Sequence, residues 1–358
     1  MSTEEVILGF LEEAEPWQLL SPQFPSKVGG KPAWLGQKGV PCLSQLECEI
    51  CHLPMVFLLQ VYAPLSGQDQ CFHRTLFLFC CKTPECYSHN DSRCMKVFRS
   101  QMPRKNEFYS YEPPPEDEPP SEPYKGHNVL PISGVKLCWI CGCPGTKACS
   151  RCHSVTYCGK HHQTIHWKHS HKRECGSQES SSVSTSPFLF PEFELVTEPE
   201  NLEKNAKDTE TKHKETEDIQ SNVEETLADS LAETELEEMA MHETEEIKVF
   251  QRFKKRIASE PHQVVRYTHG GLPLWVSAKH IPSDDDIPPC SCGSKRVFEF
   301  QVMPQLLNNL CVDSTGASID WGTVAVFTCS LSCSREADYI TEFVWKQDFT
   351  ADENNKGS

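Results

Sequence analysis

Eight cysteine and histidine residues form four closely spaced pairs within 38 residues of the chain. The pairs are Cys138 with Cys141, Cys149 with Cys152, Cys158 with His162, and His171 with Cys175. Zinc takes four cysteine or histidine donors in a tetrahedron, and a Cys-x2-Cys turn supplies two thiolates at once. Eight donors therefore make two sites, and in so short a segment alternate pairs are expected to join. One predicted site is Cys138, Cys141, Cys158 and His162, and the other is Cys149, Cys152, His171 and Cys175.

Three further donors in this segment, Cys143, His166 and His169, leave the histidine of the second site open. Four correctly spaced pairs in order are hard to obtain by chance, even in a chain with 20 cysteines. From end to end the spacing resembles the MYND zinc finger, a cross-braced interaction module. We therefore assign residues 135–175 to a MYND-type finger.

The composition of the 358-residue chain predicts two or three small domains. Only 38% of the residues are hydrophobic, so part of the chain is expected to lack a core of its own. The first residues have neither a basic region nor an apolar run, and no stretch approaches the roughly 20 apolar residues of a membrane span. Cysteines in such a chain indicate metal ligands in a reducing compartment, which predicts a cytosolic or nuclear protein without membrane attachment.

The net charge of −17 is unevenly distributed. Between Glu192 and Lys248 there are 20 acidic residues against 5 lysines, a balance of −15, which leaves −2 for the rest of the chain. Such a segment repels the phosphates of nucleic acids and attracts basic partners. A solvated linker that keeps the protein soluble is the simpler alternative.

Residues 1–111 carry cysteine pairs of their own. Cys48 and Cys51 precede an apolar run at 55–61, and a second run at 75–79 leads to the adjacent Cys80 and Cys81, with Cys86 beyond. Two strands between two cysteine pairs predict a zinc ribbon, in which the metal joins the turns at one end of a hairpin. A Pro- and Glu-rich linker follows at 112–134.

After the finger, residues 176–248 are expected to form a Ser-rich and acidic linker. We predict disorder over about 194–222 and a helix in the later part. Phe250, Phe253 and Ile257 share the helical face there, which ends before Pro261.

The last segment, 249–358, repeats the pattern of the first. The sequence Gly29–Trp34 returns as Gly270–Trp275, and Phe57-x2-Gln60 returns as Phe298-x2-Gln301. The second cysteine pair, Cys81 and Cys86, returns as Cys329 and Cys333, and Val97–Arg99 returns after it as Val344–Lys346. This is an internal duplication interrupted by the finger and the acidic linker.

The duplication chooses between Cys80 and Cys81. Aligning Phe79 with Phe327 matches Cys81 to Cys329 and Cys80 to Thr328, which predicts Cys81 as the ligand. Each lobe would then hold one zinc ion in an all-cysteine site; buried apolar cysteines without metal are the alternative. The predicted ligands are Cys48, Cys51, Cys81 and Cys86 in the first lobe, and Cys290, Cys292, Cys329 and Cys333 in the second.

The predicted fold is mainly β, with small α+β zinc modules. Trp34 and Trp275 are more simply core aromatics after a turn than ligand-stacking residues. Two small lobes have exposed sheet edges and limited cores, and side-by-side packing solves both problems. We predict one duplicated, two-lobed, zinc-stapled β domain from 1–111 and 249–358, with the finger looped out from its middle and able to move independently.

The chain as a whole resembles the programmed cell death protein 2 family, whose paired domains also occur in a yeast small-subunit assembly factor. Besides the finger, the resemblance rests on five segments: Gln60–Leu65, Pro103–Glu112, Phe298–Leu307, Ser318–Gly322 and Phe343–Asp348. It implies a dedicated chaperone for a small-subunit ribosomal protein of the S-five family, acting in ribosome biogenesis. It also implies presence in nucleus and cytoplasm and a link to co-repressor proteins through the finger.

Three function classes follow. An enzyme is disfavoured, because each predicted site has a full ligand set and the chain has no phosphate-binding Gly loop, nucleophile elbow or metalloprotease motif. A monomeric chaperone for a basic client suits the charge distribution. A transcriptional scaffold is the alternative, because residues 138–175 of the finger carry six basic residues against one acidic residue; DNA contact by so small a patch is weakly supported.

Overall fold

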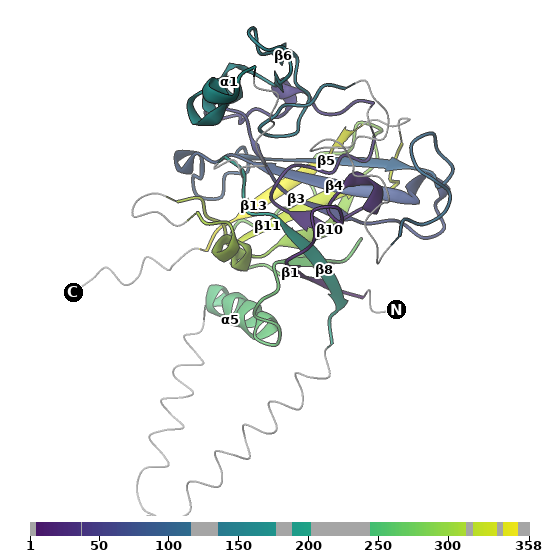
Figure 1. The fold of residues 1–358 in the computed structure, drawn as a ribbon. Coiled ribbons are helices and arrows are strands. Elements are labelled where there is room, and N and C mark those ends of the chain that lie inside the picture. The colour runs from purple at the N-terminus through teal and green to yellow at the C-terminus, as the bar shows by residue number, and fades with distance from the viewer. Residues whose placement is uncertain are drawn as a thin grey trace, which may run out of the picture.

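The computed structural model describes residues 5–36, 38–115, 135–176, 188–201, 244–312, 318–334 and 339–349, and its main feature is one eleven-stranded sheet (Figure 1). The strands are β1 (Ile7–Glu12), β2 (Lys27–Val28), β3 (Val56–Tyr62), β4 (His73–Cys80), β5 (Met95–Met102), β8 (Phe193–Pro199), β9 (Val265–Tyr267), β10 (Arg296–Val302), β11 (Thr323–Cys329), β12 (Ile340–Thr341) and β13 (Phe343–Gln347). Their order is β12-β5-β4-β3-β2-β8-β1-β9-β10-β11-β13. The expected mainly β fold and the strands expected at 55–61 and 75–79 are confirmed.

The duplication is visible in backbone geometry. Strands β3, β4 and β5 form an antiparallel meander, and β10, β11 and β13 repeat it, with a register shift after Phe57 in one copy and after Phe298 in the other. Gln60 accepts a hydrogen bond from the Ala33 amide at 2.9 Å, as its counterpart Gln301 does from the Leu274 amide at 2.6 Å. Each glutamine thus anchors the turn that carries a duplicated tryptophan.

Two strands are exchanged between the halves. β1, from the start of the chain, pairs with β9 of the C-terminal half, whereas β8, which follows the finger, pairs with β2 of the N-terminal half. β1 and β8 pair with each other over six residues at the centre of the sheet. Apart from the short edge strand β12, the strand order is therefore symmetric about the β1–β8 pair, and each half depends on a strand that lies apart from it in sequence.

The two ends of the sheet approach each other through one short segment. β12 pairs with β5 of the N-terminal half, and β13, which begins two residues later, pairs with β11. The Lys346 amide donates to the Ser92 hydroxyl at 2.8 Å, and Asn90 and Asp348 exchange two hydrogen bonds. The sheet is nearly closed, and residues from both halves share one hydrophobic core.

Two buried ion pairs cross between the halves inside this sheet. Arg74 on β4 makes two 2.7 Å hydrogen bonds to Glu299 on β10, and Arg99 on β5 donates to Glu342 at 2.8 Å. All four side chains are inaccessible to solvent. Burial raises the pKa of Glu299, but the Arg74 guanidinium outweighs this and holds the pKa below its usual range.

Glu299→Gln is expected to lower the free energy of unfolding by about 3–5 kcal/mol, because it leaves the buried Arg74 without its counter-charge. Chemical denaturation of the purified protein measures this change. Glu198→Gln, on the exposed end of β8, is the matched control and should shift the free energy by less than about 0.5 kcal/mol. Equal stability of the two variants would contradict a role for the ion pair.

The helix α5 (Glu245–Ile257) packs against the C-terminal half. Thr244 caps its N-terminus by accepting from the Ile247 amide, and Phe253 is buried against Val276 and Met303. The expected helical face ending before Pro261 is thus present; residues 202–243, with most of the predicted disorder and the earlier part of the predicted helix, lie outside the described residues.

The predicted disorder is wrong for residues 194–199. They belong to β8, which is held on both sides by β1 and β2. Beyond β8, the Glu200 carboxylate lies 2.7 Å from Arg256 of α5 and 2.9 Å from Arg266 of β9. The acidic stretch thus begins as part of the folded sheet.

Candidate metal centres

The sixteen predicted ligands lie in four groups of four in the structure. Within each group, all ligand atoms lie within 4.8 Å of one another. The groups are Cys48, Cys51, Cys81 and Cys86; Cys138, Cys141, Cys158 and His162; Cys149, Cys152, His171 and Cys175; and Cys290, Cys292, Cys329 and Cys333. The alternate pairing expected from the spacing is the one that the structure contains.

The distances within these groups fit zinc. A tetrahedral site with Zn–S bonds of about 2.3 Å separates its sulfur atoms by about 3.8 Å. The Sγ atoms of Cys51 and Cys81 are 3.6 Å apart, and those of Cys149 and Cys175 are 3.9 Å apart. None of the cysteines in the described residues forms a disulfide. Thiolate and imidazole donors at this spacing favour zinc, which would join the segments of each site.

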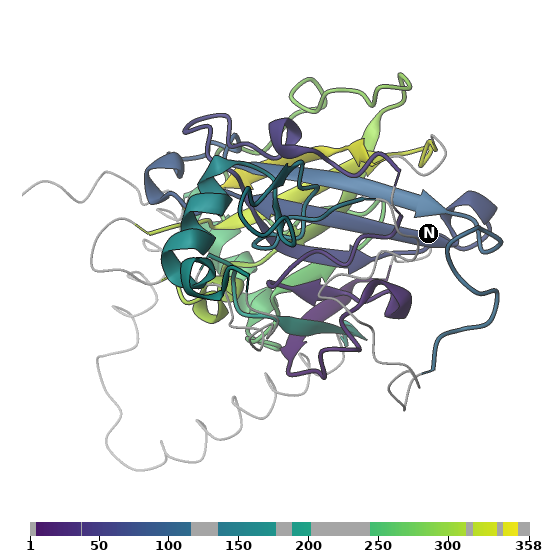
Figure 2. The ribbon, with the colours of Figure 1, turned by 45° about the horizontal axis from the view of Figure 1, so that its top comes forward.

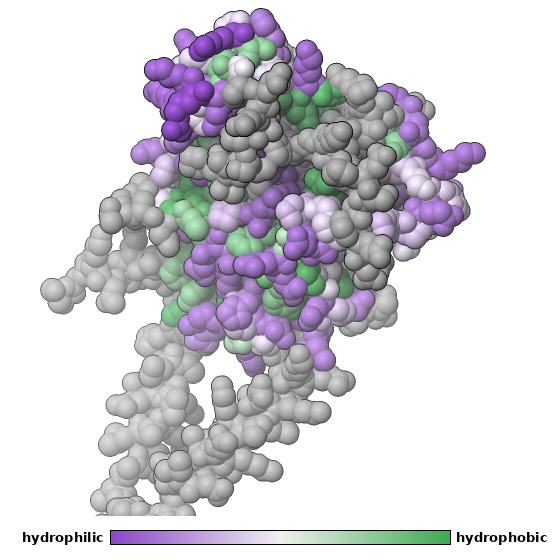
Figure 3. Space-filling view, viewed as in Figure 1, coloured by the Kyte–Doolittle hydropathy of each residue, from purple (hydrophilic) through white to green (hydrophobic). Residues whose placement is uncertain are grey.

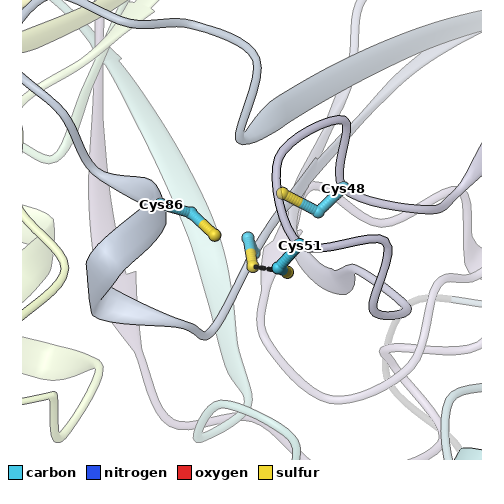
Figure 4. Close-up of side chains that lie close together, drawn as sticks. Cys48, Cys51 and Cys86 are labelled. Carbon is cyan, nitrogen blue, oxygen red and sulfur yellow. Dashed lines mark hydrogen bonds between the residues drawn. The ribbon is translucent and has the colours of Figure 1, made fainter.

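A tight turn presents Cys48 and Cys51 to the first site. The His52 amide donates to the Cys48 carbonyl at 3.0 Å, and His52 itself has a left-handed φ of 57°. The Ile50 amide points at the Cys48 sulfur at 3.5 Å. Figure 4 shows Cys48, Cys51 and Cys86 converging from two segments of chain.

The other two ligands of this site follow the end of β4. Cys81 is the next residue after the strand, and Cys86 lies on the 3-10 turn η4 (Pro84–Cys86). The side chain of Cys80 is fully buried in the core, and burial raises the pKa of its thiol, so it stays protonated. The structure therefore brings Cys81, and not Cys80, into the group, as the duplication predicts.

The site of the C-terminal lobe has a shorter turn. Gly293, with φ at 89°, follows the one-residue knuckle, and its amide donates to the Cys290 carbonyl at 2.8 Å. The Cys333 carbonyl accepts a 3.0 Å hydrogen bond from Arg99 of the other half. This contact, which the sequence analysis did not anticipate, ties the ligand loop to the interface between the halves.

The two finger sites are built on a small hairpin and one helix. The hairpin is β6 (Lys147–Ala148) and β7 (Thr156–Tyr157); the helix runs from α1 (Lys160–His166) through a π-helical turn, η5 (Trp167–His171), to α2 (Lys172–Glu174). α1 supplies His162, whose Nδ1 lies 3.0 Å from the Cys158 sulfur. η5 supplies His171, whose Nε2 lies 3.5 Å from the Cys152 sulfur.

The three spare donors have other places. His166 is buried and its Nδ1 lies 2.9 Å from the Tyr157 hydroxyl, while its ring stacks on Trp139. His169 is exposed, and the Cys143 thiol lies by the Cys141 carbonyl at 3.8 Å. The histidine left open in the second finger site is therefore His171.

The finger packs against the N-terminal lobe, so the expectation that it moves independently is wrong. The buried Trp34 indole donates to the Gly142 carbonyl at 2.8 Å, and Lys31 lies over the Trp139 ring at 5.8 Å. Figure 2 shows the teal ribbon of the finger in front of the blue strands of the N-terminal lobe. Burial lowers the pKa of Lys31, while the Cys141 and Cys138 thiolates oppose this. Trp34 is a core aromatic, as expected, but it is buried partly by the finger.

The exposed side of the finger is basic. In Figure 3 the surface above the sheet, where α1 lies in Figure 1, is strongly hydrophilic. The exposed cations of the finger are Lys136, Lys147, Arg151, Lys160, Lys168, Lys172 and Arg173. This face is available for contacts with acidic or extended partners.

Elemental analysis of the purified full-length chain is expected to give about four zinc ions per molecule, one for each group of ligands. Dialysis against a weak chelator before the measurement removes loosely bound metal. A value of two or fewer would contradict metal binding by the two lobe sites.

Three family models match the chain. The model of the programmed cell death protein 2 N-terminal domain matches residues 5–116, that of its C-terminal putative domain matches 247–348, and that of the MYND finger matches 138–175. No solved structure matches the chain. In the described residues, no helix is long and apolar enough to span a bilayer.

Curated relatives extend these matches over nearly the whole chain. Programmed cell death protein 2 of Bos taurus is 50% identical over 351 residues, covering 96% of both chains. Programmed cell death protein 2-like of Homo sapiens is 27% identical and covers 86% of this chain and 85% of its own. Probable 20S rRNA accumulation protein 4 of Schizosaccharomyces pombe is 32% identical over 98 residues, 24% of each chain.

Proposed function

We propose that this chain, which belongs to the programmed cell death protein 2 family, is a dedicated chaperone of a basic small-subunit ribosomal protein of the S-five family. It would act in ribosome biogenesis by binding and escorting its client, as a monomer present in nucleus and cytoplasm. The observation that carries this proposal is the similarity to a fission yeast protein named for 20S rRNA accumulation.

The charge distribution supports a basic client. Ribosomal proteins carry dense cationic surfaces meant for RNA, and an acidic segment can occupy such a surface until assembly. Here residues 192–248, with a net charge of −15, run from β8 into α5, and residues 201–244 between the two elements carry 14 acidic residues against 4 lysines, a balance of −10. The contact of Glu200 with Arg256 of α5 brings the two ends of this segment to one side of the sheet. The acidic chain is thus anchored at both ends on the folded body.

Binding, rather than catalysis, is the mode of action that the sites favour. The MYND finger and the programmed cell death protein 2 domains are not enzymatic families. Each metal group offers four protein donors, whereas a catalytic zinc keeps one position for water. The metal would therefore hold the lobes and the finger in shape.

A co-regulator scaffold is the second candidate function. The exposed cationic face of the finger favours it, because such a face can dock co-repressor proteins while the sheet binds elsewhere. In that case the protein would act in the nucleus in control of cell death or proliferation. The same face gives only weak support for DNA contact.

Purification of the full-length chain under mild conditions, followed by identification of the bound material, separates the two candidates. A chaperone should retain one S-five-family ribosomal protein in about equimolar amount, and purified client should bind the purified chain directly. Recovery of a range of chromatin proteins without the ribosomal protein would favour the scaffold instead.

A further inference from the structure

The duplication gives each lobe an aromatic outer face. In the N-terminal lobe this cluster, here called the N-lobe face, is Trp34 packed against Phe77 and Phe79, with its ring centroid 5.0 and 5.8 Å from theirs. The second copy contains a separate cluster, here called the C-lobe aromatic face, composed of Trp275, Ile287, Phe298, Ala325, Phe327, Phe343 and Trp345. Trp275 corresponds to Trp34, and Phe327 corresponds to Phe79.

The finger covers the N-lobe face through two residues of the duplicated turn. Trp34, only 1% exposed, donates to a backbone carbonyl in the knuckle of the finger, at Gly142. Three residues earlier, Lys31 contacts the aromatic ring of Trp139 in the same knuckle. The turn is therefore a docking element for a tight turn of another protein module.

Among the residues that the structure describes, no second module covers the corresponding positions of the C-lobe aromatic face. Leu272, the counterpart of Lys31, is 88% exposed, the most exposed large hydrophobic residue among those that the structure describes. Trp275 is only partly buried, and within the described ranges its indole nitrogen has no hydrogen-bond partner. An exposed leucine three residues before an indole N–H that has no partner in the described ranges is a combination that a bound protein segment would satisfy.

Acidic residues border this face. Asp284, Asp285 and Asp286 are exposed and directly precede Ile287, which packs on the C-lobe aromatic face. Asp284 is paired with Lys295 at 3.1 Å, and Asp286 Oδ2 accepts hydrogen bonds from the Ser283 amide and hydroxyl. Neither Asp285 nor Asp286 has a cationic partner among the described residues, so both carboxylates can attract a cation. The complementary partner combines an apolar turn with basic residues next to it.

We propose that the C-lobe aromatic face binds a tight turn of the basic client, in the way that the N-lobe face binds the finger. The inference rests on the proposed chaperone function. Trp275 would donate to a backbone carbonyl of the client, Leu272 would contact an apolar side chain, and Asp285 and Asp286 would pair with its cations.

The test measures the affinity of purified full-length chain for purified S-five-family ribosomal protein. Leu272→Lys introduces the residue that the first lobe carries at this position, so the turn can accept it, and it places a cation against a basic client. We expect at least tenfold weaker binding for Leu272→Lys and for Trp275→Ala, as for central residues of an interface. The double variant Asp285→Asn/Asp286→Asn should bind more weakly and with a smaller dependence on salt.

Phe72→Ala, which removes an exposed aromatic ring of the N-terminal lobe, is the matched control and should bind as the unaltered chain does. Unchanged affinity of both Leu272→Lys and Trp275→Ala would overturn the docking face while leaving the chaperone function intact. Failure of the unaltered chain to bind the client would overturn both. A concentration-dependent dimer abolished by Leu272→Lys, with client affinity unchanged, would assign the face to a second copy and also contradict the proposal.

Discussion

Serine in place of Cys329 is expected to unfold the C-terminal lobe and to lower the amount of soluble protein. Metal binding at a structural zinc site contributes on the order of 10 kcal/mol to folding, which is comparable to the whole stability of a typical domain. The damage should reach the other half as well, since Arg99 binds the ligand loop at Cys333 and both halves share one core. Circular dichroism during thermal unfolding, together with zinc content, measures both effects; Cys48→Ser should behave in the same way.

Cys80→Ser is the matched control for these variants. Cys80 is adjacent to a ligand and fully buried, but it lies outside the ligand group, so serine there costs only the burial of a hydroxyl, about 1–3 kcal/mol. The variant should keep its full zinc content and remain folded at moderate temperature. Equal loss of zinc from Cys80→Ser and Cys81→Ser would show that the assignment of the ligand is wrong.

The ligand groups were predictable because zinc imposes its geometry on short sequence spacings. A Cys-x2-Cys turn has few ways to present two thiolates, and the second copy resolved the choice between Cys80 and Cys81. The fold class followed from the same cysteines, because the apolar runs between them have strand length. These predictions therefore depended on cysteine spacing and on short apolar runs, both of which can be read directly from the sequence.

Strand β8 could not be predicted from its own residues. It reads Phe-Glu-Leu-Val-Thr-Glu-Pro at the start of an acidic stretch, and only Leu195 is buried in it. The strand exists because β1 and β2 offer backbone hydrogen bonds on both of its sides. Pairing between segments nearly 200 residues apart leaves no local signal in either segment.

The docking of the finger on the N-terminal lobe could not be predicted from the sequence either, because it also depends on a backbone group. The acceptor of the Trp34 indole is a backbone carbonyl, that of Gly142, and any residue offers one. The sequence did contain a partial signal for the ion pairs between the lobes. Arg99 in the apolar strand β5 aligns with Lys346 in the apolar strand β13. Charged residues at equivalent inward positions of both copies could have indicated a polar interface.

Separate expression of the two halves is expected to give insoluble protein, whereas expression together restores the fold. The appropriate division lies in 177–187, which gives fragments 1–176 and 188–358. The first fragment contains β1 but lacks β8, its neighbour in the sheet, and also lacks β9, its other neighbour. The second fragment contains β8 but lacks both strands that pair with it. Each fragment alone therefore exposes unpaired strand edges and buries no complete core.

The control is a second fragment shortened to 244–358, which removes β8 and the acidic segment but keeps α5 and all C-lobe ligands. A further control, 188–201 joined to 244–358 by a flexible linker, restores β8 without the acidic segment. Co-purification of 1–176 with 188–358 and with the linked fragment, but not with 244–358, is the expected result. Because β8 is the only described strand that pairs with both β1 and β2, its removal divides the sheet at its centre. A soluble complex of 1–176 with 244–358 would show that the remaining contacts between the halves (the β1–β9 and β5–β12 pairings, the shared core and the buried ion pairs) are sufficient, and β8 would then be unnecessary for assembly.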